Sequence, residues 1–175
     1  MQPTILTAAG RYFDFLAPER SVIGIDEIAH ALSNICRFTG HTRDFYSVAE
    51  HSVHVSRLVP PGDALAGLMH DAAEAFVGDV AKPLKRLLPD YAAIEARVEA
   101  AVLSRFGLNV TLPPTVKAAD DDMSVVEQRQ AMDAEAYDRV LPSFHNPQAK
   151  LVRLEFWEPA EARMMFLQRF EEVTL

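Results

Sequence analysis

The sequence predicts an all-α protein, a helical bundle accompanied by a small N-terminal hairpin. Apolar residues recur every three or four positions through most of the chain, which is the period of a helix with one buried face. Proline and glycine residues separate these segments, as expected where helices end. The strict alternation of apolar and polar residues that marks a half-buried strand occurs only briefly.

The N-terminal quarter is expected to contain a hairpin, one helix and a loop. Residues 4–16 hold two short apolar pieces around a glycine, which favours a hairpin. From Asp26 onward apolar residues recur at helical spacing, and this aspartate suits the cap of a first helix. Residues 36–46 are polar, aromatic and glycine-bearing, so we expect a loop there.

Two helices are expected in the middle of the chain. Ser47 and Glu50 have the spacing of a capping box, which predicts a helix over 47–59 that stops at two prolines. A second helix is predicted over 63–76, and Gly78 ends it.

Proline and glycine divide the C-terminal half in the same way. The expected elements are a helical turn over 83–88, a helix from a cap at Asp90 to Gly107, a helix over 115–135 and a loop over 142–150. Residues 152–156 alternate as a short strand would, and Pro159 suits the first turn of a last helix. Because no repeat or linker interrupts the chain, one domain over 1–175 is expected.

Composition and charge exclude several kinds of partner. The single cysteine, Cys36, cannot form an internal disulfide, which fits a reducing compartment. A net charge of −8 argues against a nucleic-acid polymer or an anionic membrane as the main partner. The N-terminus lacks a secretory pattern, and no apolar run approaches the roughly 20 residues of a membrane span. We therefore expect a soluble cytoplasmic protein with a small-molecule ligand.

Four ionisable residues stand in or just after the apolar segment 63–76. They are His70, Asp71, Glu74 and Asp79. Burying such groups costs several kcal/mol each unless they are paired or bound to a metal. A catalytic divalent metal needs several His and carboxylate ligands with one position left for water. On the preceding predicted helix His51 lies on the inward face, so it joins His70 and Asp71 as a candidate ligand.

The fourth ligand is expected from an aspartate run in the predicted helix 115–135. Asp120 shares a stripe with apolar residues and points inward. Asp121 instead groups with Lys117, Ser124 and Gln128, which we expect to form a solvated face. Asp120 is therefore the expected ligand, and Asp122 is the alternative.

These residues carry a resemblance to a known family. The series His51, His70-Asp71, Glu74, Gly78-Asp79 and Asp120 resembles the HD-domain metal-dependent phosphohydrolases. More narrowly, the chain resembles the bacterial HD-domain 5′-deoxynucleotidases and their short prophage-borne relatives. The matching stretches are Asn34–His41, Phe45–His51, Met69–Ala75, Gly78-Asp79, Pro83–Tyr91 and Val116–Asp120. The likeness runs from about residue 4 to the last helix and is weakest in 133–158.

For the metal, the resemblance implies one catalytic divalent ion, which could be Zn²⁺, Mn²⁺, Co²⁺ or Fe²⁺. The implied ligands are His51, His70, Asp71 and Asp120. The resemblance and the position of Glu74 one turn beyond His70 imply that Glu74 transfers a proton. Asp79 would orient a ligand or hold a sugar hydroxyl, although it is equally suited to cap a turn at 80–86.

For the substrate, the resemblance implies a nucleoside phosphate. Arg37 would contact the phosphate, with Lys85 and Lys117 as further cations, and His41 is a candidate for the pocket because it lies in a matching stretch. In the deoxynucleotidases the arginine that resembles Arg37 is followed by a tryptophan, a ring thought to disfavour the ribose 2′-hydroxyl. Phe38 stands here, so preference for deoxyribose stays open.

Three functions are considered for these residues, two enzymatic and one not. The first is a 5′-deoxynucleotidase that converts a deoxynucleoside monophosphate to deoxynucleoside and phosphate. The second is a deoxynucleoside triphosphate hydrolase, in which Lys82, Lys85 and Arg86 would bind the longer tail. The third is a non-catalytic nucleotide sensor that retains its metal. The apolar last helix also allows a homo-oligomer, a dimer or higher.

Overall fold

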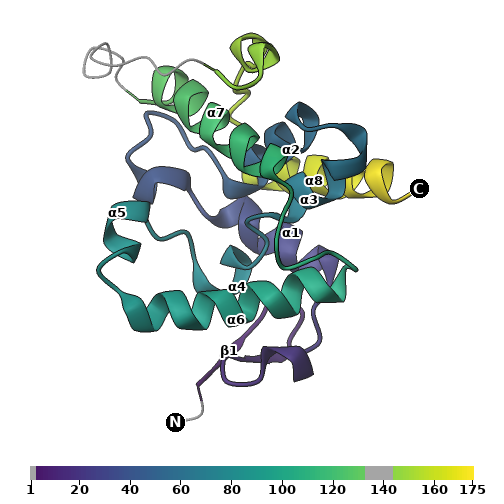
Figure 1. Ribbon diagram of the computed structural model, residues 1–175. Helices are drawn as coiled ribbons and strands as arrows, with labels where there is room; N and C mark the ends of the chain where they lie inside the picture. The colour runs from purple at the N-terminus through teal and green to yellow at the C-terminus, as the bar shows by residue number, and fades with distance from the viewer. Residues whose placement is uncertain (1–2, 133–143) are drawn as a thin grey trace.

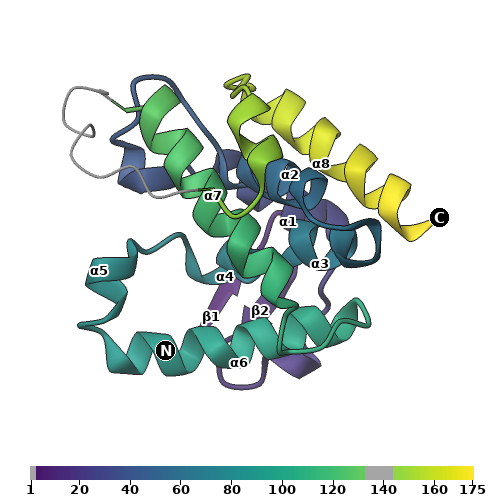
Figure 2. The same ribbon diagram turned by 45° about the horizontal axis from the view of Figure 1, so that its top comes forward.

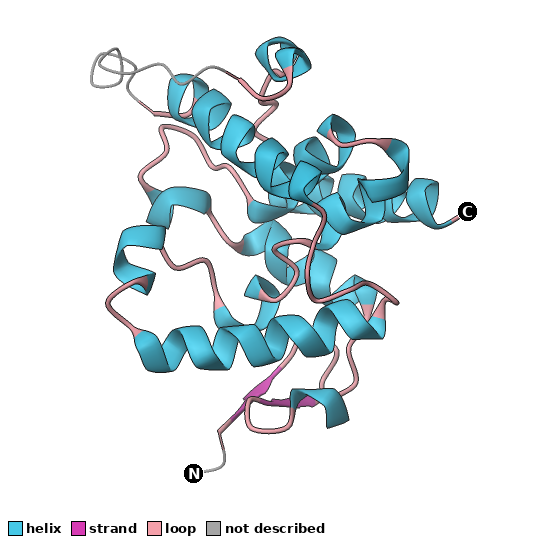
Figure 3. Cartoon of the chain, in the orientation of Figure 1, coloured by secondary structure: helices cyan, strands magenta, loops and turns pink. Residues whose placement is uncertain are grey.

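Helices make up most of the chain in the computed structural model, which describes residues 3–132 and 144–175 (Figure 1 and Figure 3). The helices are α1 (Ile25–Asn34), α2 (Val48–Leu58), α3 (Ala64–Met69), α4 (Glu74–Val77), α5 (Lys82–Lys85), α6 (Pro89–Arg105), α7 (Pro114–Gln130) and α8 (Pro159–Thr174). Short 3₁₀ turns occur at Pro18–Arg20, Arg37–Gly40, Pro61–Asp63 and Pro147–Leu151. Among the described residues, no helix combines the length and apolar character needed to cross a membrane.

The predicted N-terminal hairpin is confirmed. Strands β1 (Thr4–Leu6) and β2 (Tyr12–Asp14) pair antiparallel, with Ile5 opposite Phe13. Phe13 is buried, and its ring stacks on that of Phe76 with the centroids 4.0 Å apart. This contact attaches the hairpin to α4, and Figure 3 shows its strands at the N-terminal end of the molecule.

Helix α2 lies at the centre of the bundle. It contacts α1, α3, α7 and α8, and every residue from Val48 to Ser56 is buried. In Figure 2, α7 runs across the bundle near α2, with α8 beyond it. A helix surrounded in this way brings its polar side chains into the interior, where each needs a partner.

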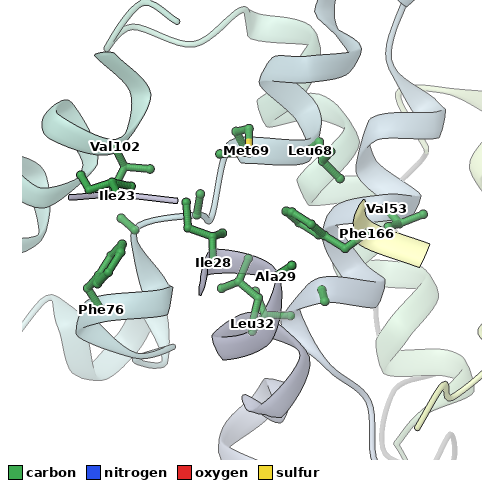
Figure 4. Close-up of a cluster of buried hydrophobic side chains, with 14 of the residues drawn as sticks. Ile23, Ile28, Ala29, Leu32, Val53, Leu68, Met69, Phe76, Val102 and Phe166 are labelled. Atoms are coloured by element: carbon green, nitrogen blue, oxygen red, sulfur yellow. The ribbon is translucent and has the colours of Figure 1, made fainter. Parts of the chain in front are cut away.

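The main core joins α1, α2, α3, α6 and α8. Figure 4 shows side chains from these helices in one cluster, among them Leu32, Val53, Leu68 and Phe166. Gly67 allows α3 to approach α2 closely, because a Cβ there would lie 3.1 Å from the Cα of Ser56. The tight approach places the end of α3 beside α2.

Two of the predicted helix caps are wrong. Helix α1 begins at Ile25 with Gly24 as its N-cap, and α6 begins at Pro89 with Leu88 as its N-cap. Asp26 and Asp90 lie in the first turns, where a carboxylate still interacts favourably with the helix dipole. Pro89 takes the first helical position because it has no N–H to leave unpaired. Gly107, with φ of 72°, ends α6 as predicted.

The single helix predicted over 63–76 is divided in the structure. Between α3 and α4 the backbone N–H of Ala72 donates to Met69 and that of Glu74 to Asp71, both bonds spanning three residues. This tighter turn, with about 3.0 residues per turn, re-aims the side chains it carries. Gly78, with φ of 82°, ends α4 as predicted.

Other predicted boundaries shift as well. The loop predicted over 36–46 contains the 3₁₀ turn at Arg37–Gly40, and the loop predicted over 142–150 contains most of the turn at Pro147–Leu151. Helix α7 ends at Gln130, earlier than predicted, while 133–135 and 142–143 lie outside the described residues. Residues 152–156 form no strand. Pro159 occupies the first turn of α8, which confirms that prediction.

Only half of the predicted capping box forms. The hydroxyl of Ser47 accepts a hydrogen bond from the N–H of Glu50, as expected. The Glu50 carboxylate is fully buried and accepts the backbone N–H groups of Glu155, Phe156 and Trp157 at 2.7–3.0 Å. The backbone N–H groups of the segment before α8 therefore bond a carboxylate of α2, so they are not available to pair with a strand.

This contact predicts a strong dependence of stability on Glu50. In Glu50→Gln one acceptor oxygen becomes an NH₂ group that faces backbone N–H donors, so the free energy of unfolding should fall by about 2–3 kcal/mol. Urea denaturation followed by circular dichroism measures the change. Glu171→Gln, on the exposed face of α8, is the control and should change it by less than about 0.5 kcal/mol. Equal effects of the two substitutions would contradict the assignment.

Candidate metal centre

Side chains from α2, the turn after α3, and α7 converge on one point. The Nε2 atom of His51 lies 3.2 Å from Nε2 of His70 and 3.5 Å from a carboxylate oxygen of Asp120. Asp71 adjoins both histidines, since its Oδ2 lies 3.5 Å from Nε2 of His51 and 3.2 Å from that of His70. The ligand atoms of His51, His70 and Asp120 all lie within 4.8 Å of one another.

The spacing of these atoms fits a divalent cation. Ligands bound at about 2.0–2.2 Å lie about 3.0–3.5 Å from their neighbours around the ion. The outer nitrogen of each ring is engaged, since Nδ1 of His51 lies 2.5 Å from Glu127 Oε1 and Nδ1 of His70 lies 2.9 Å from the Gly67 carbonyl. A neutral ring that donates from Nδ1 would present an Nε2 lone pair to a cation at the centre. His51, His70 and Asp120 could therefore hold a metal ion, and Asp71 adjoins both histidines.

Each of these four side chains also has an outer partner, which limits its rotation. Beyond the contacts of the two histidines, Arg37 Nη1 lies 3.6 Å from Asp71 Oδ2, and Lys82 Nζ lies 3.0 Å from Asp120 Oδ2. The remaining oxygen of Asp120 is the one that faces His51. Each of the four side chains of the cluster is thus held in place by a group outside it.

The structure separates the three consecutive aspartates. Asp120 lies in the cluster, whereas Asp122 is buried elsewhere and accepts the backbone N–H groups of His145 and Asn146 at 2.8 and 2.7 Å. Asp121 is half-exposed and pairs with Lys117. The arrangement brings Asp120, the expected ligand, to the histidines, and Asp122 has a structural partner instead.

The pKa values of the cluster reflect close contacts between groups of opposite charge. Burial and the charge of Arg37 would lower the pKa of His51, but Glu127 and Asp120 outweigh them and raise it to about 9. Burial would raise the pKa of Asp71 and Asp120, but the neighbouring histidines hold both pKa values well below the usual range. All three shifts stabilise the ionised form of the group concerned.

A cavity of about 290 Å³ opens beside this cluster. Its wall includes Asp71 and Asp120 from the cluster and residues from the turn at 37–39, the segment 79–85 and one face of α7. Phe38 and Thr39 line it from a left-handed backbone, with φ of 53° and 56°. Such a conformation is strained for these residue types, and strain of this kind gathers at functional sites.

Two further carboxylates line the cavity. Glu74 is 8% exposed, and its buried Oε2 has no hydrogen-bond partner among the described residues. Burial, together with the charges of Asp71 and Asp79, raises the pKa of Glu74, which favours its protonated form. Burial is also the main cause that raises the pKa of Asp79. Asp79 does not cap α5, whose N-cap is Ala81.

Only some of the residues predicted to bind substrate line the cavity. Arg37, Phe38 and Lys85 line the cavity, and Lys85 also pairs with Glu95 at 2.6 Å. His41 is exposed and is not among the lining residues. Lys117 is likewise absent from the wall, although its Nζ lies 3.9 Å from Asp120 Oδ2.

Sequence reasoning missed several residues of the site. Ser124 and Gln128 were expected on a solvated face, but both line the cavity at positions four and eight after Asp120, so that expectation is wrong. Lys82, which the sequence suggested only as a contact for a longer phosphate tail, bonds Asp120 directly. Glu127 is fully buried. Its position on the apolar stripe of α7 could have identified it, because a carboxylate there must be buried with a partner.

No model of a known protein family matches the chain. The chain is 39% identical over 171 residues to the uncharacterized protein YfdR of Escherichia coli K12, a match that covers 97% of this chain and 95% of YfdR. It is 38% identical over 181 residues to the uncharacterized protein RCAP_rcc00048 of Rhodobacter capsulatus, with 92% and 90% of the two chains covered. The chain therefore belongs to the same protein family as YfdR.

Proposed function

We propose that the protein is a divalent-metal-dependent phosphohydrolase, one HD-type domain over residues 1–175, that releases phosphate from deoxynucleoside monophosphates. The observation that carries the proposal is the convergence of His51, His70, Asp71 and Asp120 beside a cavity lined by a buried carboxyl group, Glu74, whose Oε2 has no hydrogen-bond partner among the described residues. The order of these ligands along the chain agrees with the resemblance to HD-domain phosphohydrolases.

The two histidines and two aspartates would hold the cation, and this ligand set suits Zn²⁺, Mn²⁺, Fe²⁺ or Co²⁺. When bound, the ion supplies Lewis-acid chemistry that polarises a phosphoryl oxygen and makes water easier to deprotonate. The chain itself supplies position and charge, which are the main requirements of phosphoryl transfer.

Positive charge from the protein would orient the phosphate. The cations that line the cavity are Arg37, Lys82 and Lys85. The guanidinium of Arg37 suits phosphate oxygens because its N–H groups are planar and paired. Phe38 follows Arg37 in the wall of the cavity, so its ring is available to contact the sugar.

Glu74 would transfer the proton that the reaction requires. As the oxygen of water bonds to phosphorus, the bond from phosphorus to the 5′ oxygen of the sugar breaks and that oxygen gains a proton. A buried carboxyl group with a raised pKa can donate it. The same group is then regenerated by the proton released from water. A nucleotide sensor would have no need of a proton-transfer group, so the buried Glu74 carboxyl group in the cavity wall supports an enzyme over a sensor.

The size of the cavity favours a monophosphate. At about 290 Å³ it lies just below the usual range for small-molecule sites, about 300–1,000 Å³. A triphosphate hydrolase is the second candidate because Lys82 and Lys85 both line the wall, where a longer phosphate tail could reach them. Arg86 is not a lining residue, which reduces the cations available to that tail.

The first test is catalysis with defined metals. Protein stripped with a chelator and reloaded with Mn²⁺, Co²⁺ or Zn²⁺ should release orthophosphate from at least one deoxynucleoside monophosphate. Loss of an outer partner typically lowers activity by about 10–100-fold. Asp71→Ala removes a proposed direct ligand, so kcat/KM should fall by more than this. Asp121→Ala is the matched control and should retain activity.

Product analysis separates the alternatives in the same assay. Release of triphosphate from a deoxynucleoside triphosphate would support the triphosphate hydrolase and argue against the monophosphatase. Parallel assays with ribonucleotides measure whether Phe38 permits the 2′-hydroxyl. The proposal fails if no nucleotide is hydrolysed with any of the metals.

The second test separates the catalytic and structural effects of Glu74. If protonated Glu74 donates the proton, Glu74→Gln should lower kcat by about 10²–10⁴-fold and remove the fall in rate as pH rises through the pKa of Glu74. A carboxyl group whose pKa is raised on folding stabilises the fold below its unfolded pKa, and this contribution is lost as pH rises through its folded pKa. Glu74→Gln should therefore raise Tm at neutral pH. An inactive variant with lowered Tm would contradict this role.

A further inference from the structure

Glu127 is a fully buried carboxylate on α7, two turns after Asp120. Its Oε1 lies 2.5 Å from Nδ1 of His51 and accepts the Tyr46 hydroxyl at 2.9 Å. Its Oε2 accepts two N–H groups of Arg37, from Nη2 at 3.0 Å and Nε at 3.3 Å. The two oxygens thus serve two different groups, one at the metal cluster and one at the cavity.

The contact to His51 determines how that ring is presented. A neutral imidazole carries its proton on either nitrogen, and a carboxylate at Nδ1 selects the form in which Nε2 keeps its lone pair. Tyr46, also fully buried, bonds the same oxygen and restricts its position. Without Glu127 no carboxylate would hold the proton on Nδ1, and Nε2 could carry it instead.

The contact to Arg37 holds the guanidinium at the cavity wall. Arg37 is 8% exposed, and Glu127 is its partner through Nε and Nη2. The remaining nitrogen, Nη1, is the one that lies 3.6 Å from Asp71 Oδ2. A long side chain fixed at one edge loses less freedom when its other edge binds a ligand.

We propose that Glu127 is a positioning residue that holds His51 for the metal and Arg37 for the phosphate with its two oxygens. Metal affinity and substrate affinity therefore depend on one buried carboxylate. The part that concerns Arg37 rests on the proposed function, whereas the part that concerns His51 requires only that the cluster binds a metal.

A purely structural role is the competing explanation, and α7 offers a matched control. Asp122 is also buried, with 2% exposed, and it also accepts several hydrogen bonds, from His145 and Asn146. Its partners lie outside the cluster. Asp122→Asn should therefore disturb stability without acting on the metal.

The test is a calorimetric titration of the metal-stripped full-length protein with Zn²⁺ and with Mn²⁺, in the absence of nucleotide. Glu127→Gln should weaken binding by about 10–100-fold, and Asp122→Asn should leave the affinity within about threefold of the wild-type value. Tyr46→Phe removes one bond to the same oxygen and should give a smaller change in the same direction. Equal effects of Glu127→Gln and Asp122→Asn would overturn the proposal.

A second measurement addresses Arg37. With every protein saturated with metal, Glu127→Gln should raise KM for a deoxynucleoside monophosphate, whereas Asp122→Asn should not; an unchanged KM would overturn the link to the phosphate. If Glu127→Gln fails to fold, Glu127→Asp retains the charge but withdraws it by one methylene. Weaker metal binding by Glu127→Asp supports the proposal, and unchanged binding overturns it. Because the titration contains no substrate, it is decisive for His51 even if wild-type protein hydrolyses no nucleotide.

Discussion

The burial of α2 on all sides is the constraint on which the rest of the structure depends. A central helix usually carries apolar residues all round, but α2 also carries Glu50 and His51, both fully buried. Each must find its partners in other parts of the chain, since an unpaired buried charge or hydrogen-bonding group is costly. Glu50 accepts hydrogen bonds from the backbone before α8. His51 contacts Asp71 in the turn after α3 and two carboxylates of α7. The polar residues of α2 thus set the positions of three separate segments.

This constraint explains how far the sequence could predict the fold and the site. The helical period placed His51 and Asp120 inward, because burial of one face is a local property of spacing. The break between α3 and α4 and the partners of Glu50 were missed. Residues 155–157 stand more than 100 positions after Glu50, so no local pattern reports that contact. Ser124 and Gln128 were misassigned because a polar stripe looks the same whether it faces bulk water or the wall of a cavity.

The site shows why polar burial is tolerated here. The charged groups at the site have partners of opposite charge, since Arg37 adjoins Glu127 and Asp71, and Lys82 adjoins Asp120. Such a network holds its geometry only while it is complete, since removing one member leaves its partner buried and unpaired. The order of the chain adds to this coupling, because Asp120 and Glu127 lie two turns apart on α7. Movement of that helix would shift Asp120 and Glu127 together.

In the proposed function, the charge balance of the cavity would make binding of a phosphate depend on binding of a cation. Among the described residues, the ionisable groups that line the cavity are four carboxyl groups, Asp71, Glu74, Asp79 and Asp120, and three cations, Arg37, Lys82 and Lys85. The raised pKa of Glu74 favours its uncharged form, which brings the negative and positive charges closer to balance. A phosphate monoester carries about −1.5 to −2 at neutral pH and would find no net attraction in such a cavity. A divalent cation supplies an excess of positive charge of nearly the same size. In a chain of net charge −8, binding of the anion would then depend on binding of the metal.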